Sequence, residues 1–268
     1  MDKIIAEGSL ILLHFDLRRQ WLLRVVVGRD FHSHKGYIKL GDLVGKPFGC
    51  EITSSTLDRF WALRPTTHDL IMHTVRQTQI MYPKDIGLII LKLSLTSGAK
   101  VLEIGTGSGA MTVAAAMAVR ESGHVDTYEV RPEFVEIAEK NLKRASLAEY
   151  VTIHQTDAAK GIEGEGYDAA IIDVGDPWPL IPLVHGALLG GAPVMSFSPT
   201  FNQVERSTET FGKVGFVNVH TLECFIREIR AETGRTRPAT MMIGHTGYMT
   251  FAQKVLPPTS EQSKPSPA

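Results

Sequence analysis

The 268-residue sequence holds only two cysteines, Cys50 and Cys224, which are far apart and form neither a CxxC pair nor a metal-ligand spacing. It therefore lacks the disulfide framework of a small secreted protein and suits a reducing compartment. It also lacks a long hydrophobic run, since the longest nearly apolar stretch, 110–119, is about half of what a bilayer span needs. Residues 1–7 provide no basic leader followed by an apolar core. We expect a cytoplasmic protein without a membrane partner.

Neither sign of charge is in large excess, because 28 Lys and Arg face 29 Asp and Glu, for a net charge of -1. That balance alone argues against a nucleic-acid partner. The distribution is less even, since residues 1–65 hold ten basic against seven acidic side chains and the remainder eighteen against twenty-two. A mildly basic first quarter is compatible with contact to a polyanion, although charge alone favours an ordinary solvated surface.

The composition, 43% hydrophobic and 21% charged, is typical of a globular protein and excludes disordered and fibrous classes. Short β-prone runs punctuated by glycines predict a small β domain over residues 1–65. From 66 to 256, apolar strands alternate with amphipathic helices, which predicts a second, α/β domain. Residues 257–268 contain four prolines and three serines and are expected to be a disordered tail.

The α/β alternation can be followed through about 150 residues. Helices are predicted at 67–75, 85–93, 108–120 and 132–145, and strands at 100–104, 124–129, 151–154, 169–173 and 193–197. Such an order predicts a Rossmann-like, mostly parallel sheet with helices on both faces. Ligands bind such sheets at the carboxyl ends of the strands.

A glycine-rich segment, residues 103–109, follows the first of these strands and opens a helix. Glycines there let the backbone approach a ligand that the helix N–H groups face. The spacing Gly105-x-Gly107-x-x-Ala110 also fits a dinucleotide fingerprint with Glu129 as its ribose acid. The glycine pattern alone therefore leaves a dinucleotide and a nucleoside methyl donor open.

Two further acids favour the methyl donor. Glu103 lies two residues before the first glycine, and Asp157 follows the third strand. A donor with an adenosine end needs a carboxylate for its ribose hydroxyls and a polar group for its adenine amine. Glu129 and Asp157 fit these two needs.

The fourth strand ends at Asp173, directly after the apolar run 169–172, so this carboxylate is expected to project into the cleft beside the cofactor. It is the catalytic candidate. Asp176 precedes Pro177 and fits a helix cap better. No metal is expected, because His32 and His34 have neither helical spacing nor a third ligand nearby.

Several particular segments occur together along the chain. They are Phe31-His-Ser-His-Lys-Gly36, Leu63-Arg-Pro65, Gln79-Ile-Met-Tyr-Pro-Lys-Asp85, Val101 to Gly109, Tyr128-Glu129 and Ile243-Gly-His-Thr-Gly-Tyr-Met-Thr-Phe251. Together they resemble the tRNA (adenine-58-N1)-methyltransferase family over about residues 8–255. The His-Thr-Gly-Tyr run and Asn202-Gln-Val204 are most similar to archaeal members.

This resemblance implies a class I methyltransferase fold, S-adenosyl-L-methionine as cofactor, and a homotetramer that grips tRNA. The implied reaction is methylation of N1 of adenosine 58 in the T loop, with adenosine 57 as a second target in some archaeal members. Asp173 would be catalytic and would serve the adenine. The cofactor residues would be Gln79, Gly105, Gly107, Ser108, Gly109, Ala110, Met111, Glu129, Phe134, Asp157 and Asp173, and the substrate residues Tyr82, Phe197, Asn202 and His245.

The chain departs from the family pattern at two places. It has Phe197-Ser-Pro199 where members often have Tyr-x-Pro, so a hydroxyl contact is absent and only stacking would remain. The segment after the fourth strand reads Asp-Val-Gly-Asp-Pro-Trp in place of Asp-Leu-Pro-x-Pro, with Asp173 retained.

Three other functions stay open from the residues. A methyltransferase for isoaspartyl protein or a small molecule would share the cofactor half but not the added N-terminal domain. A non-catalytic tRNA-binding subunit usually lacks the glycine loop and the catalytic acid, both of which are present here. A nicotinamide-dependent oxidoreductase is disfavoured, because no proton-relay pair is evident.

Overall fold

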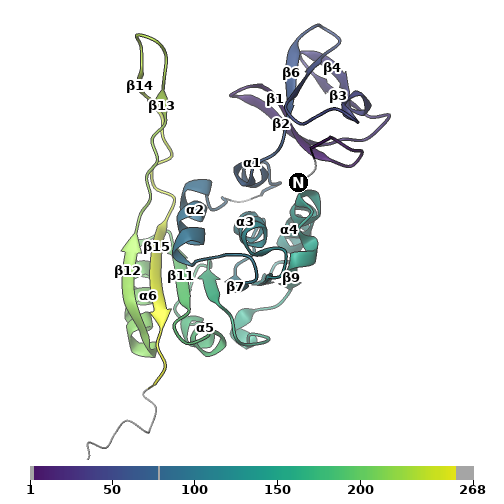
Figure 1. The fold of residues 1–268 in the computed structure, drawn as a ribbon. Helices are drawn as coiled ribbons and strands as arrows, with labels where there is room; N and C mark the ends of the chain where they lie inside the picture. Colours follow the sequence, from purple (N-terminus) through teal and green to yellow (C-terminus); the bar gives the residue numbers. More distant parts are fainter. Residues whose placement is uncertain (1–2, 78, 258–268) are drawn as a thin grey trace, which may run out of the picture. The chain divides into compact units, whose positions relative to one another are not determined.

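The computed structural model describes residues 3–77 and 79–257 and divides the chain into two compact units, Met1–Thr74 and Val75–Ala268 (Figure 1). The sequence predicted a boundary after residue 65. The later boundary assigns helix α1 (Thr67–Met72) to the N-terminal unit. The predicted tail, 257–268, lies outside the described residues except for Pro257. Within the described ranges, no helix is both long and apolar enough to cross a bilayer.

The N-terminal unit is built on a four-stranded antiparallel sheet in the order β2-β1-β6-β5. Its strands are β1 (Leu10–Asp16), β2 (Arg19–Arg24), β5 (Cys50–Thr53) and β6 (Arg59–Leu63), and a separate hairpin pairs β3 (Asp30–Ser33) with β4 (Gly36–Lys39). Alternate residues of β6, Phe60 and Ala62, point into a core with Ile11 and Leu13. The small β domain expected from the glycine-punctuated runs is present.

The C-terminal unit contains a seven-stranded sheet in the order β12-β15-β11-β10-β7-β8-β9. The strands are β7 (Lys100–Ile104), β8 (His124–Tyr128), β9 (Val151–His154), β10 (Ala169–Ile172), β11 (Pro193–Ser198), β12 (Phe216–Leu222) and β15 (Tyr248–Lys254). Strands β7 to β11 pair in parallel, whereas β15 runs antiparallel to both of its neighbours. All four residues of β10 are buried, as expected for a central parallel strand.

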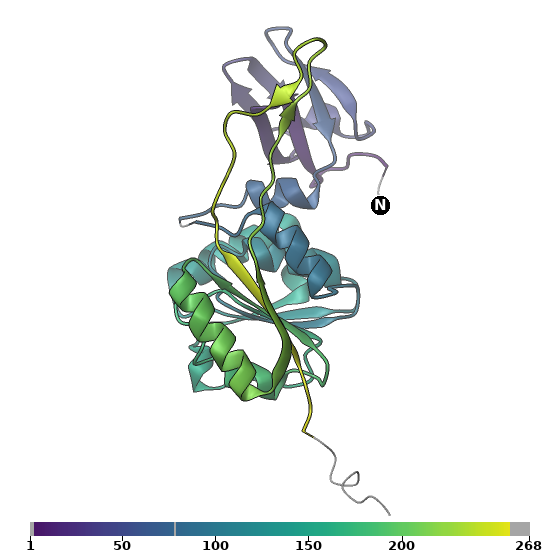
Figure 2. The same ribbon diagram turned by 90° about the vertical axis from the view of Figure 1, so that its left-hand side faces the viewer.

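Helices cover both faces of this sheet, as Figure 2 shows with α6 on one side and α2 on the other. The helices are α2 (Pro83–Lys92), α3 (Ala110–Val119), α4 (Pro132–Ala145), α5 (Ile181–Ala187) and α6 (Phe201–Val214). Proline at the first turn begins α4, and Ser146 in the left-handed conformation ends it. The predicted mostly parallel α/β architecture is confirmed.

A long hairpin arm leaves the sheet between β12 and β15, and the sequence did not predict it. It comprises residues 223–247, with the short strands β13 (Ile229–Arg230) and β14 (Arg237–Pro238) paired near its tip (Figure 1). Its exposed apolar side chains are Phe225, Ile226, Ile229, Met241, Met242 and Ile243. Exposure of this many apolar groups on one thin element indicates a contact surface.

Candidate active site

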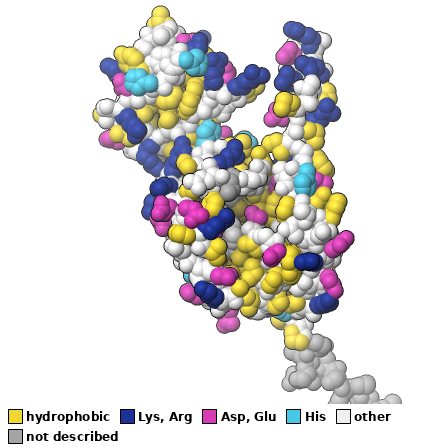
Figure 3. All heavy atoms as spheres, turned by 180° about the vertical axis from the view of Figure 1, so that it is seen from behind, with side chains coloured by type: hydrophobic (Ala, Val, Ile, Leu, Met, Phe, Trp, Pro, Cys, Tyr) yellow, Lys and Arg dark blue, Asp and Glu magenta, His cyan; other side chains and the backbone are white. Residues whose placement is uncertain are grey.

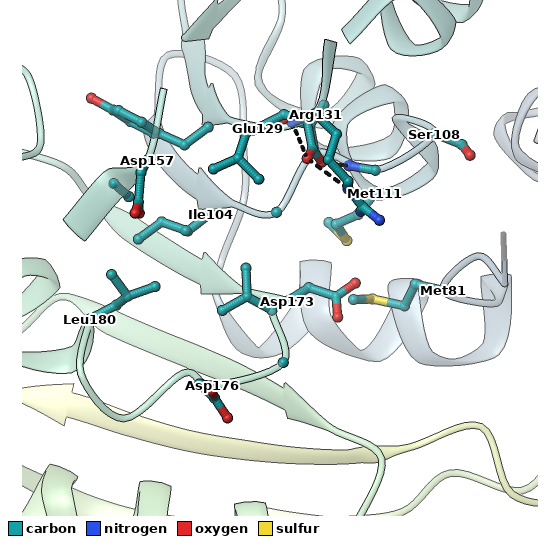
Figure 4. A pocket seen from close by; sticks show the side chains of 18 of the residues that line it. Met81, Ile104, Ser108, Met111, Glu129, Arg131, Asp157, Asp173, Asp176 and Leu180 are labelled. Atoms are coloured by element: carbon teal, nitrogen blue, oxygen red, sulfur yellow. Dashed lines mark hydrogen bonds and ion pairs between the residues drawn. The ribbon is translucent and has the colours of Figure 1, made fainter. Parts of the chain in front are cut away.

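A cavity of about 750 Å³ opens at the carboxyl ends of β7, β8 and β10 in the C-terminal unit. This is the position at which parallel α/β sheets bind ligands. The hollow is visible in the space-filling view (Figure 3), and Figure 4 shows the side chains that surround it. Of the predicted site residues, nine line it: Gln79, Gly105, Gly107, Ser108, Ala110, Met111, Glu129, Asp157 and Asp173.

The three glycines of the loop, Gly105, Gly107 and Gly109, differ in what a side chain at each position would meet. At Gly105, whose φ is +101°, a Cβ would lie 2.0 Å from the carbonyl oxygen of Asp173, so only glycine lets the loop meet the end of β10. At Gly109, a Cβ would lie 3.2 Å from the Ala138 side chain of α4. Gly107 instead faces open space, with nothing within 4 Å of its would-be Cβ. A ligand can therefore approach the backbone at Gly107.

Glu129 holds the loop from the end of β8. Its Oε2 accepts a 2.9 Å hydrogen bond from the N–H of Gly107, and its Oε1 accepts bonds from the N–H and Nε of Arg131, at 3.0 and 3.3 Å. The side chain is buried, so these bonds fix its orientation at the cavity wall (Figure 4). An ionised carboxylate has about four acceptor sites, which leaves room for a ribose hydroxyl.

Asp157 lies in the same wall, after β9. Its Oδ1 accepts a 2.9 Å hydrogen bond from the N–H of Ala159 and so caps the short turn Ala158–Lys160. The residue is exposed and lines the cavity, with its second oxygen available. This placement agrees with a polar contact to an adenine amine.

Asp173 follows β10, and its backbone N–H donates to the carbonyl of Ile104 at 2.8 Å. Its carboxyl group is exposed to the cavity, where it and the Met81 side chain point toward one another (Figure 4). No hydrogen-bond donor to this carboxyl occurs among residues 3–77 and 79–257. Protein packed closely around the group desolvates it and raises the pKa of Asp173 to about 6. The structure thus presents an unpaired acceptor to a ligand.

Glu103 is a second acid at this end of the sheet, buried within β7. Its Oε2 accepts 2.6 Å hydrogen bonds from the hydroxyl groups of Thr112 and Thr127. Its Oε1 is buried without a partner among the described residues. Burial raises the pKa of Glu103 to about 7, and the nearby charges of Asp173 and Glu129 add to this effect. The sequence singled out Glu103 as an acid that favours a methyl donor, but it did not indicate that the side chain is buried and bonded to two threonines.

Sequence reasoning missed other parts of the wall, namely Ile80, Met81, Arg131, Thr156, Asp176, Leu180 and Pro199. These residues come from loops and from the segment before α2, so no periodic pattern points to them. Ile80, Met81, Asp176 and Pro199 nevertheless lie within segments that the sequence analysis had quoted, so the sequence marked their neighbourhood but not their place in the wall.

Two residues that the resemblance gave to the cofactor do not line the cavity. Gly109 packs on α4, as described above. Phe134 is buried in α4 with the Arg131 guanidinium 3.9 Å above its ring centroid. Its position supports Arg131, which itself lies in the wall. A role for Phe134 through Arg131 fits the structure better than direct contact.

Phe197 does not form the stacking wall that the sequence predicted. It is 8% exposed, and a Cβ on Gly247 would lie 2.4 Å from its ring, so the ring is packed beneath that glycine. Tyr82 is half-buried at the N-cap of α2, next to Met81. Asn202 is exposed in the first turn of α6. Neither Tyr82 nor Asn202 lines the cavity.

His245 also lies outside the cavity wall but touches its rim. Its Nδ1 is 2.8 Å from a carboxylate oxygen of Glu223, and its Nε2 is 3.0 Å from the carbonyl oxygen of Pro199, which lines the cavity. Hydrogen bonding to Glu223 and then to Pro199 raises the pKa of His245, because a doubly protonated ring can donate to both acceptors.

The two most particular sequence segments meet in a buried ion pair. The Nζ of Lys84 donates to Asp85 at 2.8 Å, to the Cys224 carbonyl at 2.7 Å and to the Thr246 hydroxyl at 2.6 Å. The Thr246 hydroxyl donates to Asp85 at 2.7 Å. This clamp ties the start of α2 to both strands of the arm's base, and so fixes the segment 79–81 that lines the cavity.

These residues fit S-adenosylmethionine. The cavity volume suits a ligand of this size. Glu129 offers acceptors for a ribose, Asp157 a contact for an adenine, and the open backbone at Gly107 a close approach. The Ser108 hydroxyl lines the cavity and is buried without a partner among the described residues. No group of three or more His, Cys, Asp or Glu side chains in the described chain is placed to hold a metal.

Comparisons with known proteins agree with this site. Residues 60–236 match the family model described as tRNA methyltransferase complex GCD14 subunit. The chain is 31% identical over 261 residues to tRNA (adenine(57)-N(1)/adenine(58)-N(1))-methyltransferase TrmI of Methanocaldococcus jannaschii, covering 88% of this chain and 91% of the relative. It is 29% identical to tRNA (adenine(58)-N(1))-methyltransferase TrmI of Thermus thermophilus, covering 86% and 91%.

Two solved structures share the whole fold. A SAM-dependent O-methyltransferase from Thermotoga maritima has a TM-score of 0.88 and 35% identity, covering 96% of this chain and 97% of its own. The tRNA (m1A58) methyltransferase TrmI from Aquifex aeolicus has a TM-score of 0.81 and 34% identity, covering 95% and 100%. The cavity retains the glycine loop, Glu129 and Asp173. The family model and the archaeal relative together show that the chain belongs to the GCD14 family of tRNA methyltransferases.

Proposed function

We propose that the protein transfers a methyl group from S-adenosylmethionine to N1 of adenosine 58 in the T loop of tRNA. The observation that carries this proposal is the unpaired Asp173 carboxyl group, exposed in a nucleoside-sized cavity at the end of β10. Relatives named for this reaction support it, and the archaeal relative named for positions 57 and 58 supports adenosine 57 as a second target.

The residues of the chain would act mainly by alignment and electrostatics. S-adenosylmethionine supplies the methyl group as an electrophile on a sulfonium. The wall at Glu129 and Asp157 orients the nucleoside end of the donor, and holding two reactants in line contributes about 7 to 11 kcal/mol to rate enhancement. Ionised Asp173 accepts a hydrogen bond from the adenine N6 amino group. This bond raises electron density at N1 and opposes the positive charge that methylation places on the ring.

In folded tRNA the target adenine is engaged within the T loop, so it has to be extruded before it can enter the cavity. Such extrusion costs a few kcal/mol, which contacts elsewhere on the tRNA offset. Basic side chains outnumber acidic ones in the N-terminal unit, whereas acidic ones outnumber basic ones in the rest of the chain, and we assign phosphate contact to this unit.

The test is to incubate purified protein with labelled S-adenosylmethionine and an unmodified tRNA transcript, and to map the label by nuclease digestion. Label at N1 of adenosine 58 is the expected result. The name of the Thermotoga maritima neighbour raises an oxygen acceptor as the second candidate. Label on a ribose oxygen, or label only on protein or small molecules, would contradict the proposal.

The same proposal includes a homotetramer that acts in the cytoplasm, where its tRNA substrate is found. The exposed apolar residues of the arm support self-association, because a two-stranded ribbon is marginal on its own. Two relatives are named as catalytic subunits, which fits action within an assembly. Light scattering during size-exclusion chromatography measures the subunit number directly, and a monomer would contradict this part.

A further inference from the structure

The first helical residue of α6 is an exposed aromatic side chain that the proposed reaction does not use. Phe201 is 67% exposed and stands two residues after Pro199, which lines the cavity. Its ring is nevertheless held in place, because it stacks on Tyr248 with centroids 4.6 Å apart and planes 23° apart. One face of the Phe201 ring is therefore covered, and the large exposure leaves the other face open.

The ring of Tyr248 rests on a third aromatic residue. His245 lies with its ring centroid 4.7 Å from that of Tyr248, and we call Phe201, Tyr248 and His245 the aromatic cluster. His245 is itself held between Glu223 and the carbonyl of Pro199. The cluster is thus connected to the cavity rim through Pro199.

The backbone beneath Phe201 is fixed as well. Thr200 forms a capping box with Gln203, in which each side chain bonds to the backbone N–H of the other. The amide of Gln203 also donates a 2.7 Å hydrogen bond to the carbonyl oxygen of Gly175, a cavity residue two positions after Asp173. The start of α6 is therefore fixed by its own capping box and by one bond to the rim, at Gly175, so the open face of Phe201 is presented by a rigid support.

The surroundings favour a single flat ligand over a broad protein partner. Thr200, Asn202 and Glu205, which are neighbours of Phe201 along the chain, are exposed polar residues, so the start of α6 offers a single open aromatic face bordered by polar side chains. Extrusion of a base into the cavity would also leave an adjoining base of the loop with a stacking face that has lost its neighbour. An aromatic face two residues from the rim can replace that neighbour.

We propose that the aromatic cluster is a stacking platform for the nucleobase next to the adenine that enters the cavity. This inference rests on the proposed function. Stacking of a base on an aromatic side chain contributes about 1 to 3 kcal/mol and tolerates any base, because every base has a π face. The platform therefore helps to hold the opened loop without adding sequence preference.

The first experiment compares Phe201→Ala, Phe201→Leu and Phe201→Tyr with the unaltered protein. Phe201→Ala should raise the KM for a tRNA transcript roughly tenfold, in line with the loss of one stacked base. Phe201→Leu keeps apolar bulk but has no π face, so it should show the same increase, while Phe201→Tyr should restore tRNA affinity. The Kd for S-adenosylmethionine should not change. Leu91→Ala, which removes another exposed apolar side chain, from α2, should leave both constants unchanged.

The second experiment observes stacking directly. A tRNA with 2-aminopurine on either side of adenosine 58 should lose fluorescence on binding, at one of the two positions, and Phe201→Ala should abolish that loss. The platform is overturned if quenching persists in Phe201→Ala, or if Phe201→Ala and Phe201→Leu bind tRNA like the unaltered protein. It is also overturned if Phe201→Ala changes only the subunit number, which would make Phe201 a subunit contact. If the unaltered protein fails to methylate tRNA, the proposed function itself fails.

Discussion

Two acids at the same end of the sheet, Asp173 and Glu103, differ in what surrounds them, and that difference decides their chemistry. Asp173 has an unpaired carboxyl group facing the cavity, whereas Glu103 is sealed inside β7 and bonded to two threonine hydroxyls. Both have raised pKa values, at about 6 and about 7. Only Asp173 can reach a substrate, so Asp173 is the residue whose charge should control the rate.

The rate of methyl transfer should depend on pH through Asp173. Its pKa is raised, so the proton is bound below about pH 6 and the carboxyl then no longer opposes charge on the adenine. We expect kcat/KM to fall about tenfold per pH unit below that value. Asp173→Asn should lower the rate about 10²- to 10⁴-fold and remove this acidic dependence of the rate on pH. An identical dependence in Asp173→Asn would assign the titration to another group.

Glu103 should affect stability rather than rate. The Glu103 carboxyl has a raised pKa, so it binds its proton more tightly in the folded state than in the unfolded state. The free energy of unfolding should therefore fall as the pH rises from the pKa of the unfolded chain toward about 7. Going from pH 6 to pH 8 should therefore cost about 1 kcal/mol, or roughly 2 to 4 °C in Tm. Glu103→Gln should lack this pH dependence while retaining acceptance from both threonines. Thermal unfolding at the two pH values measures it, and an equal drop in both proteins would contradict the assignment.

At the scale of elements, local signals predicted what local physics determines. Helix α4 and strands β7 and β9 have the predicted bounds. The helix is marked by a proline at its start and an amphipathic face, and the strands by short apolar runs, and each of these signals depends on residues close together in the sequence. Glu129 and Asp173 could be placed in the site for the same reason, since each directly follows a strand.

The remaining elements depend on contacts that are distant in sequence. Phe197 was predicted to form a wall, but Gly247, fifty positions later, leaves a slot that its ring fills. The arm has no strong hydrophobic period of its own, because it is exposed and its two short strands form, among the described residues, a sheet of two strands. The aromatic cluster likewise brings Phe201 to Tyr248 through the pairing of β11 with β15.

The clamp at the start of α2 should be essential to both stability and the cavity. Asp85→Asn would leave the Lys84 charge buried without its counter-charge, at a cost of about 3 to 5 kcal/mol. Replacing both residues with apolar side chains, as Lys84→Met and Asp85→Leu together, should recover much of that stability. The double variant should still show a raised KM for tRNA, because it lacks the bonds that hold the arm's base. Thermal unfolding and steady-state kinetics separate the two effects.

An exposed ion pair supplies the control for this prediction. Glu136→Gln breaks the pair with Lys140 on α4, where both side chains are more than two-thirds exposed, and should change stability by at most about 1 kcal/mol. Equal losses in Asp85→Asn and Glu136→Gln would show that burial of the clamp has no special weight.

At the scale of the whole molecule, the chain divides its charge as it divides its fold. The N-terminal unit, residues 1–74, carries a surplus of two basic side chains and the remainder a surplus of three acidic ones. A catalytic unit with an acidic cavity suits a cationic cofactor, whereas a basic unit suits phosphates. The separate units thus fit the separate tasks of methyl transfer and tRNA capture.

The salt dependence of tRNA binding should therefore reside in the N-terminal unit. Arg18, Arg29 and Lys39 are exposed there, and converting all three to glutamine should make the slope of log Kd against log salt shallower, by about 0.7 to 0.9 for each phosphate that is no longer neutralised. The Kd for S-adenosylmethionine should not change. The matched control converts three exposed lysines of the catalytic unit to glutamine, namely Lys140, Lys143 and Lys213. Each of these lysines is paired with a glutamate four residues earlier. Because those charges are already offset, the control should keep the full slope, and a larger change of slope in the control would place tRNA capture on the catalytic unit.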